Sequence, residues 1–388
     1  MSKRLDTEVW SLDNCAGCGL CVATCSKGVL MWDKGDHPVV RHQLKTVGYS
    51  KSNLDSCTFC QKFCEESCPR LERWMPREAR VILSAQARGP IKSGAPNDVV
   101  RAILAAGRTT GLLDGVVMLD LDPWKLEPHS NIAESIEQIV DNLGPQYLWA
   151  PVFDSLNRAI FDLGMKNLAV FSTPCSAQAI RKLKSSKNPR LKPYQEAIRL
   201  SIAIFCTGTY KPQVIEEILV KRMDVSPEQV KRIEISADRD WMRAVLWDGS
   251  VRTIPRQEAE RYTRPGCGTC DDYLGESADI AVGTLGAPDN LSTLIIRTRA
   301  GDIFVRNAVQ LNLLETNTQV DLEALAAAAE EKDRRERARV FKDLQILMLD
   351  GLTDPYKRNE AIQQFIRLYR TPRQPMGLET AGGGCTGC

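Results

Sequence analysis

The stretch Cys15-Ala-Gly-Cys18-Gly-Leu-Cys21-Val-Ala-Thr-Cys25 carries four cysteines at the spacing C-x2-C-x2-C-x3-C. A second stretch, Cys57-Thr-Phe-Cys60-Gln-Lys-Phe-Cys64-Glu-Glu-Ser-Cys68-Pro69, repeats this spacing with one extra residue. Three thiolates on a tight loop can reach three corners of an iron–sulfur cubane, whereas the fourth, on the departing helix, points to the other cluster. The two stretches therefore predict two [4Fe–4S] clusters that lie close enough to exchange electrons.

Exchange of the last ligand between the two stretches determines the expected ligand sets. One cluster takes Cys15, Cys18, Cys21 and Cys68, and the other takes Cys57, Cys60, Cys64 and Cys25. Zinc is the alternative, because C-x2-C pairs also make tetrahedral zinc sites. It fits less well, since a cross-donated fourth ligand is typical of double-cluster ferredoxins. Ser26 stands where a proline usually follows the first stretch, and this departure moves no ligand.

Composition narrows the setting of the protein. The chain has 388 residues, 43% of them hydrophobic, which is enough for two or three domains with ordinary cores. Its start, MSKRLDTEVW, lacks an apolar signal segment, and no apolar run approaches the ~20 residues that span a bilayer. With a net charge of +2, nothing global indicates a nucleic-acid partner. We expect a reducing, cytoplasmic location rather than a disulfide-stapled secreted protein.

Hydrophobic patterning predicts three units and an α/β fold, α+β overall. These are a ferredoxin-like module at 1–85, a mixed α/β flavin-binding and iron–sulfur domain at 86–306, and a helical extension with a flexible, cysteine-containing tail at 307–388. The expected helices lie near 97–108, 131–143, 153–163, from Ser176 onward and near 212–223. The expected strands lie at 114–121, 167–172, 200–206, in a hairpin over 244–253 turned at Asp248-Gly249, and at 278–284 and 293–305. The charged helix at 321–346 is either a solvated helix or a docking surface.

Four further cysteines stand near the ends of expected strands. Cys175 follows one strand at the start of a helix, Cys206 ends the next strand, and Cys267-Gly-Thr-Cys270 forms a C-x2-C pair. If the strands are parallel, these thiols share the carboxyl edge of one sheet, where open α/β folds bind their ligands. They could hold a third cubane or serve as small core residues. Cys385 and Cys388 end the chain, and we assign them no role.

Several common catalytic motifs are missing. The sequence has no G-x-G-x-x-G after a strand, no G-x-x-x-x-G-K-[ST] and only three histidines. Cubanes carry single electrons, whereas most organic donors give hydride, so an enzyme built on these clusters needs a two-electron converter. A flavin is the most economical choice.

Phrases between residues 92 and 305 resemble the beta-subunit family of coenzyme F420-dependent hydrogenases and dehydrogenases. The phrases are Asp122-Pro123-Trp124, Ser172-Thr173-Pro174-Cys175 with Gln178-Ala179-Ile180-Arg181, Phe205-Cys206, and Cys267-Gly-Thr-Cys270-Asp271-Asp272-Tyr273 followed by Ala278-Asp279-Ile280, Gly283-Thr-Leu-Gly286, Ser292-Thr293 and Arg297-Thr298. The cysteine-rich module in front is also similar to that of several members. The resemblance covers about residues 10 to 305 and excludes the tail.

The resemblance implies a flavoprotein that binds FAD, exchanges hydride with coenzyme F420 and passes single electrons to [4Fe–4S] clusters. It also implies that Cys175, Cys206, Cys267 and Cys270 ligate a third cluster. The expected partner is another redox subunit, such as a hydrogenase, a formate dehydrogenase or a heterodisulfide reductase.

Ten residues are the expected flavin contacts: Ser93, Gly94, Asn97, Thr173, Ser176, Gly283, Gly286, Ser292, Thr293 and Arg297. The glycines allow close backbone approach, and Arg297 could offer a fork to a phosphate or to a reduced flavin. The bland alternatives are a β-turn with a surface arginine, and a helix cap at Thr173. The phrase at 93–98 lacks the family's usual glycine pair. Two other functions stay open: a ferredoxin-dependent flavin reductase of another substrate, such as a tetrapyrrole, and a non-catalytic electron-transfer subunit with a degenerate flavin site.

Overall fold

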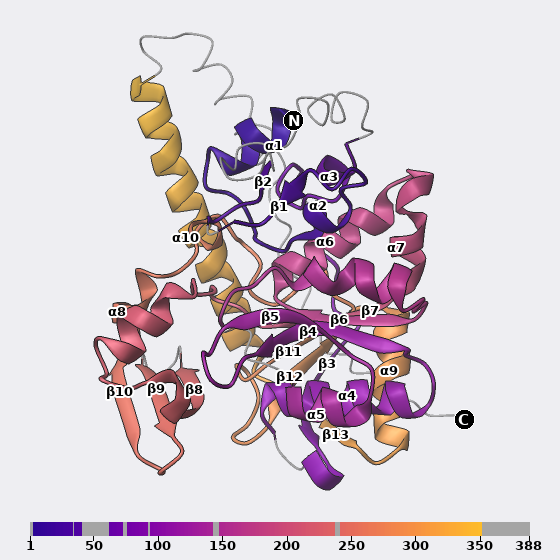
Figure 1. The fold of residues 1–388 in the computed structure, drawn as a ribbon. Coiled ribbons are helices and arrows are strands. Elements are labelled where there is room, and N and C mark those ends of the chain that lie inside the picture. The colour runs from indigo at the N-terminus through magenta and orange to yellow at the C-terminus, as the bar shows by residue number, and fades with distance from the viewer. Residues whose placement is uncertain are drawn as a thin grey trace.

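The structure of the chain is a computed structural model, and it describes residues 3–33, 35–40, 62–72, 76–91, 94–142, 147–236 and 241–350. Five residues named above lie outside these ranges: Cys57, Cys60, Ser93, Cys385 and Cys388. The described ranges form a central sheet with helices on both faces and a cysteine-rich module at one end (Figure 1).

The central sheet has the strand order β13-β3-β12-β11-β7-β6-β4-β5. Its strands are β3 (Val81–Ala87), β4 (Gly115–Leu121), β5 (Pro128–Ala133), β6 (Leu168–Ser172), β7 (Ile198–Ile204), β11 (Ile280–Gly283), β12 (Ser292–Ile296) and β13 (Leu314–Asn317). Strands β11, β7, β6 and β4 run parallel to one another, whereas β12 and β5 run antiparallel to their neighbours. The ends of the parallel strands therefore meet at one edge, which we call the carboxyl edge.

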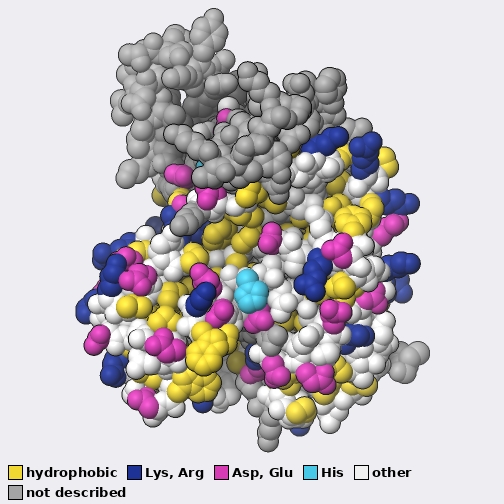
Figure 2. All heavy atoms as spheres, viewed as in Figure 1, with side chains coloured by type: hydrophobic (Ala, Val, Ile, Leu, Met, Phe, Trp, Pro, Cys, Tyr) yellow, Lys and Arg dark blue, Asp and Glu magenta, His cyan; other side chains and the backbone are white. Residues whose placement is uncertain are grey.

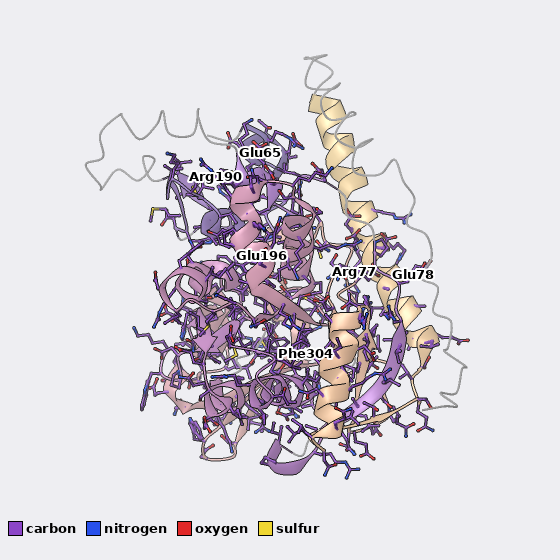
Figure 3. All side chains as sticks on the ribbon, turned by 90° about the vertical axis from the view of Figure 1, so that its right-hand side faces the viewer. Glu65, Arg77, Glu78, Arg190, Glu196 and Phe304 are labelled. Carbon is purple, nitrogen blue, oxygen red and sulfur yellow. The ribbon has the colours of Figure 1, made fainter. Side chains whose placement is uncertain are left out.

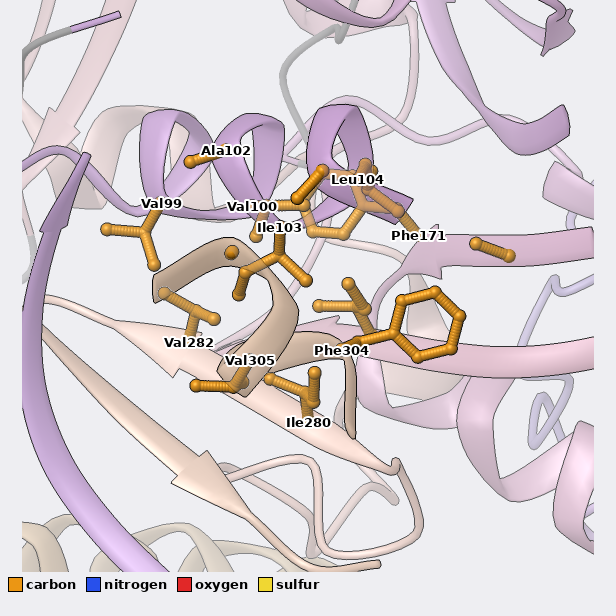
Figure 4. Close-up of a cluster of buried hydrophobic side chains, with 14 of the residues drawn as sticks. Val99, Val100, Ala102, Ile103, Leu104, Phe171, Ile280, Val282, Phe304 and Val305 are labelled. Carbon is orange, nitrogen blue, oxygen red and sulfur yellow. The ribbon is translucent and has the colours of Figure 1, made fainter. Parts of the chain in front are cut away.

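Alternation along the strands divides the apolar side chains between two cores, as the two-residue period of a strand requires. On β4, Val116 and Met118 face one core, and Val117 and Leu119 face the other. The first core lies under α4 (Pro96–Thr109) and α9 (Arg299–Gln310), as Figure 4 shows. Because Val99, Val100, Ile103 and Leu104 recur at helical spacing, α4 presents one continuous apolar face to the sheet.

Phe304 provides a direct test of this core. It is 1% exposed and packs so closely on α4 that a Cβ added at Gly107 would lie 2.8 Å from its ring. We expect Phe304→Ala to lower the free energy of unfolding by about 3–5 kcal/mol. The neighbouring Ile303 is 42% exposed, so Ile303→Ala should change it by less than about 0.5 kcal/mol. Anaerobic denaturant titration measures both variants, and equal effects would contradict this packing.

The opposite face of the sheet is covered by two groups of helices. One group contains α6 (Pro174–Ser185), α7 (Lys192–Ala197), the 3-10 helix η6 (Val152–Ser155) and the π-helix η7 (Arg158–Asp162). The other is α10 (Leu322–Asp350), whose Leu325 and Ala329 pack against Ala281 and Ile295 of the sheet. The first turns of α10 are thus part of the core of the α/β domain.

The cysteine-rich module is built from very short elements. These are α1 (Lys3–Leu5), η1 (Asp6–Trp10), α2 (Leu20–Ala23), α3 (Phe63–Glu66), β1 (Leu30–Met31) and β2 (Val39–Val40). Its buried core contains Leu5, Val9, Trp10, Cys21, Val29, Leu30, Val40, Cys68 and Leu71. Two of these nine residues are cysteines, and Cys15, Cys25 and Cys64 pack against the cluster, so the thiols form part of the described core of the module.

Hydrogen bonds dock this module onto the α/β domain. The carbonyl oxygen of Ala23 accepts from Asn157 Nδ2 at 2.9 Å and from Tyr194 Oη at 3.0 Å. At the other side Asn188 Nδ2 donates to Glu66 at 3.1 Å. Figure 3 shows the neighbouring Glu65 of α3 above Arg190 and Glu196. The module and the domain therefore share one interface that runs from α2 to α3.

A smaller unit stands beside the central sheet (Figure 1). Its sheet consists of β8 (Val230–Ser236), β9 (Trp241–Leu246) and β10 (Val251–Pro255), flanked by the π-helix η9 (Ile215–Val220) and α8 (Arg256–Glu260). The remaining short helices are α5 (Ile136–Asn142), η5 (Gly89–Ile91), η8 (Pro189–Leu191), η10 (Pro227–Gln229) and η11 (Pro265–Cys267). The hairpin predicted over 244–253 is confirmed, with Gly249 at a φ of 86° in its turn.

Three sequence predictions of elements need correction. The helix expected near 131–143 begins only at 136, because residues 128–133 pair with β4 as an edge strand. The strand expected over 293–305 ends at Ile296, and Thr298 caps α9 by accepting from Gly301 N at 3.1 Å. The stretch after 307, expected to be helical, contains β13, which pairs with β3. The expected domain boundaries at 85/86 and 306/307 fall inside β3 and inside α9.

The surface shows no dominant charge in the view of Figure 2, where basic and acidic side chains are interspersed below the grey region. This agrees with the small net charge of +2. Among the described helices, none combines the length and the apolar character needed to span a membrane.

Candidate metal centre

Four cysteines of the module line one cavity. Cys15, Cys18, Cys21 and Cys68 surround it together with Trp10 and Trp32. Two glycines shape the loop between the first cysteines, with φ of 73° at Gly17 and 87° at Gly19. A Cβ at Gly17 would also overlap the Arg264 guanidinium, so only glycine fits there. We call these four residues the first cysteine group.

Burial determines the protonation of the first cysteine group. It raises the pKa of Cys68 to about 11 and raises the pKa of Cys18 and Cys21 further, with nearby thiols adding repulsion. Burial also raises the pKa of Cys15, although Arg264 opposes this. Without a cation the thiols are therefore protonated, whereas a bound iron–sulfur core would stabilise them as thiolates. All are free of disulfides. The donor set thus fits a cubane.

The second expected ligand set is described only in part. Cys25 follows α2 and Cys64 lies on α3, and both pack against the core of the module. Tyr194 lies near Cys25. Burial is the larger cause that raises the pKa of Tyr194 to about 12, and the Cys25 thiol adds to this rise. The other two ligands of this set, Cys57 and Cys60, lie outside the described residues. The second set therefore stays a prediction.

The remaining described cysteines converge at the carboxyl edge. Cys175 is the second residue of α6, Cys206 follows β7, and Cys267 and Cys270 lie at the end of η11 and just beyond it. Burial raises the pKa of Cys175, and Cys270 and Cys267 raise it further. Burial likewise raises the pKa of Cys206, with Lys332 opposing and the other three thiols adding to the rise. We call these residues the third cysteine group.

Local donors already point at this group. The backbone N–H of Thr209 donates to Cys267 Sγ at 3.4 Å, and Thr173 Oγ1 lies 3.2 Å from Cys175 Sγ. Hydrogen bonds to sulfur of this kind are among the features that set cluster potentials. In the described ranges, no three His, Cys, Asp or Glu side chains come close enough together to hold a single metal ion.

The first and third cysteine groups touch each other. Cys175 Sγ donates to the carbonyl oxygen of Ala16, within the first loop, at 3.7 Å. On the other side, a Cβ added at Gly266 would lie 2.0 Å from the carbonyl oxygen of Cys15, so only glycine allows this approach. The two groups are thus neighbours in space, and the Cys175–Ala16 contact joins residues 159 positions apart in the chain.

Six of the expected flavin contacts also gather at the carboxyl edge. Gly94 and Asn97 lie at the start of α4, and Gly283, Gly286, Ser292 and Thr293 lie around the β11–β12 turn. Most are already engaged by the protein. Ser292 Oγ bonds the Gly94 carbonyl oxygen, Thr293 Oγ1 bonds that of Leu285, and a Cβ at Gly283 would lie 2.0 Å from the Phe205 ring. Among the described residues, α4 has no side-chain cap and the buried Asn97 Oδ1 accepts from no donor, so a ligand could bind there.

Of the other described flavin candidates, Thr173 and Ser176 also lie at the carboxyl edge, whereas Arg297 does not. Thr173 and Ser176 begin α6 beside Cys175, where Ser176 Oγ accepts from Ser172 Oγ at 3.0 Å. Arg297 follows the end of β12, which runs antiparallel, and so lies at the edge opposite Gly283. Its Nε donates to the carbonyl oxygen of Arg77 at 3.2 Å. The nearby carboxylate of Asp279 accepts hydrogen bonds from the hydroxyls of Ser201 and Thr298. The structure thus does not bring Arg297 to the other flavin candidates, and the residues around it brace the sheet.

Known proteins show the same two-part organisation. A family model described as "4Fe-4S dicluster domain" matches residues 14–70, and a second one, for the C terminus of the coenzyme F420 hydrogenase/dehydrogenase beta subunit, matches residues 165–321. An uncharacterized protein of Methanocaldococcus jannaschii is 33% identical over 86% of this chain and 97% of its own. The chain belongs to the coenzyme F420 hydrogenase/dehydrogenase beta-subunit family.

Relatives with named functions are more distant members of this family. The beta subunit of the coenzyme F420 hydrogenase of Methanosarcina barkeri is 27% identical over 69% of this chain and 92% of its own. In fold, the chain matches a chain of the F420-reducing [NiFe] hydrogenase complex from the same organism with a TM-score of 0.64 at 24% identity, over 70% of this chain and 94% of that one. The dicluster match supports two [4Fe–4S] clusters in this family member.

Three basic residues at the centre were not identified from the sequence. Arg70 donates to the carbonyl oxygens of Thr269 at 3.1 Å and Gly266 at 3.2 Å. Lys332 of α10, outside the family match, donates to the carbonyl oxygens of Asp272 at 2.9 Å and of Cys206. Burial lowers the pKa of Lys332, but the third cysteine group outweighs this and raises it. No spacing rule marks these residues, because their partners are distant in sequence.

Arg264, the third of these basic residues, holds the loop of the first cysteine group in place. It is 2% exposed, stacks on Trp149 with its guanidinium carbon 4.0 Å from the ring centroid, and donates to Ala16 O at 3.0 Å. We expect Arg264→Ala to weaken docking of this loop by roughly 1.5–3 kcal/mol, since hydrogen bonds from charged groups contribute that much. Amide exchange of residues 15–25 measures the change.

The matched control for Arg264 is Arg261, an exposed arginine three residues earlier. Arg261→Ala removes the same charge without touching the loop, so exchange at residues 15–25 should stay as in the unmodified protein. Equal acceleration in both variants would show that Arg264 does not hold the loop.

Proposed function

We propose that the protein exchanges hydride between coenzyme F420 and a bound FAD and passes single electrons through three [4Fe–4S] clusters to or from a partner redox subunit. The observation that carries this proposal is the contact between the third cysteine group, at the ligand-binding edge of the sheet, and the first cysteine group in the module. It gives electrons a continuous route from the α/β domain to the module.

A bound flavin supplies the conversion between a two-electron hydride donor and single-electron clusters. The residues of this chain that would hold it are the start of α4, with Asn97 Oδ1, and the turn between β11 and β12. Helix α4 begins with Pro96, which has no N–H, and Asp98 N donates to the Ala95 carbonyl oxygen at 2.9 Å, so Asn97 N is the amide of this first turn that could meet an anionic group. Two relatives are named as beta subunits of coenzyme F420 hydrogenases, which supports the same substrate here.

A partner subunit is the expected far end of this route. The fold match is to one chain of a hydrogenase complex, and the module that would hold two clusters lies at one end of the domain (Figure 1). We propose that the module delivers electrons to that partner, or receives them from it.

Anaerobic purification followed by iron, flavin and activity measurements tests the proposal. We expect about twelve iron atoms per chain, retained FAD, and bleaching of F420 absorbance with an artificial electron donor. Asn97→Ala should lower the retained FAD, whereas Thr109→Ala, at the other end of α4, should not. Retained FAD without any reaction with F420 would exclude F420 as the substrate and favour the reduction of another compound.

A second candidate is an electron-transfer subunit without flavin. It is favoured by the engagement of Ser292, Thr293, Gly283 and Gly94 in contacts within the protein. A full iron content without FAD, unchanged after incubation with excess FAD, would support this candidate and reject the enzyme.

A further inference from the structure

The half-buried Arg70 and the buried Lys332, from distant parts of the chain, flank the third cysteine group. Arg70, two residues after Cys68, reaches from the module and binds carbonyl oxygens on both sides of Cys267. Lys332 reaches from α10 and binds the carbonyl oxygen of Cys206 and that of Asp272, two residues after Cys270. Each cation thus contacts the backbone that carries the thiols and not an acidic side chain at the surface.

Both cations are held in place by the fold. Lys332 is 9% exposed and continues the buried stripe of α10 that starts with Leu325 and Ala329. The Nε of Arg70 is buried and donates to no atom of the described residues. A buried N–H without an acceptor is unfavourable, so an acceptor is expected beside it. Sulfur atoms of a cluster held by the third cysteine group, whose Cys270 and Cys175 interact electrostatically with Arg70, would supply one.

We infer that Arg70 and Lys332 are positioning residues whose fixed positive charges favour the reduced form of a cluster held by the third cysteine group. Reduction adds one negative charge to a centre already surrounded by four thiolates, and nearby cations stabilise the more negative state most. Because Arg70 follows a ligand of the first group, it also couples the two centres mechanically. The inference rests on the proposed third cluster.

Redox titration of the purified holoprotein, followed by electron paramagnetic resonance, tests this inference. In Lys332→Gln we expect the ratio of reduced to oxidised third cluster at fixed potential to fall at least tenfold, a shift of about 59 mV for a one-electron couple. Lys332→Arg keeps the charge and should stay near the unmodified protein. Arg335→Gln is the matched control, because Arg335 lies one turn further on α10 with its side chain 64% exposed.

The possible results distinguish absence of the third cluster from absence of the proposed effect of the cations. If the unmodified protein holds only about eight iron atoms, the third cluster itself is absent and the proposed route fails. If it holds about twelve and Lys332→Gln leaves the titration unchanged, only the role of the cations is rejected. Equal shifts in Lys332→Gln and Lys332→Arg would show a packing effect and also reject it.

Loss of the third cluster from Lys332→Gln would move the test to Arg70→Gln, with Arg70→Lys as its charge-conserving partner. We expect the same tenfold fall in Arg70→Gln and a smaller change in Arg70→Lys. Loss of the cluster from both glutamine variants would assign the two residues to folding and overturn the inference.

Discussion

Cys206→Ala lowers the iron content from about twelve to about eight atoms per chain and removes one of the cluster signals. We expect this result because Cys206 is the member of the third cysteine group that follows β7, and no other described thiol can take its place at that strand end. The signals of the two module clusters should remain, since Cys15, Cys18, Cys21 and Cys68 form a separate group.

Iron analysis and electron paramagnetic resonance of dithionite-reduced protein measure this loss. Thr207→Ala is the matched control, because the adjacent Thr207 is exposed. An unchanged iron content in Cys206→Ala would show that the convergence at the carboxyl edge is only core packing.

Removal of iron should unfold the cysteine-rich module while the α/β domain stays folded. The module has strands of two residues and helices of three to five, and cysteines make up part of its core. In small metal domains the binding free energy, on the order of 10 kcal/mol, is the folding free energy. We therefore expect amide protection in residues 3–33 to fall by at least about a hundredfold after chelation.

Hydrogen exchange of the chelated and the reconstituted protein measures this effect within one sample. Amides of β4, β6 and β7 serve as the internal control, because their core of Val116, Met118 and Phe171 contains no thiol. Equal loss of protection in the sheet would mean that the two parts fold as one unit. Unchanged protection of the module would mean that its apolar core is sufficient.

Sequence patterns predicted the cysteine ligands, because a cluster requires its ligands at characteristic spacings. The eight cysteines were recognisable because a cubane needs closely spaced ligands, and four of them do surround one cavity. The third group could be expected because Cys175 and Cys206 follow strands that proved parallel. Strands that alternate with helices make this topology the default.

Sequence rules failed where distant segments meet. Arg297 stood near Ser292 and Thr293 in the same phrase, but an antiparallel strand carries its two ends to opposite edges of the sheet. Strand β13 was missed because its partner β3 lies more than 200 residues earlier. Lys332 belongs to a helix that the charge pattern showed as solvated or docking, and only the packing of Leu325 reveals its buried side.

The contact between Arg264 and Ala16 has a consequence for synthesis of the protein. The ribosome releases the first cysteine loop long before it makes the arginine that holds this loop, with 248 positions between them. Because domains form as the chain emerges, the N-terminal thiols wait exposed while most of the sheet is still being translated. Iron loading before that time would act on a loop without its clamp.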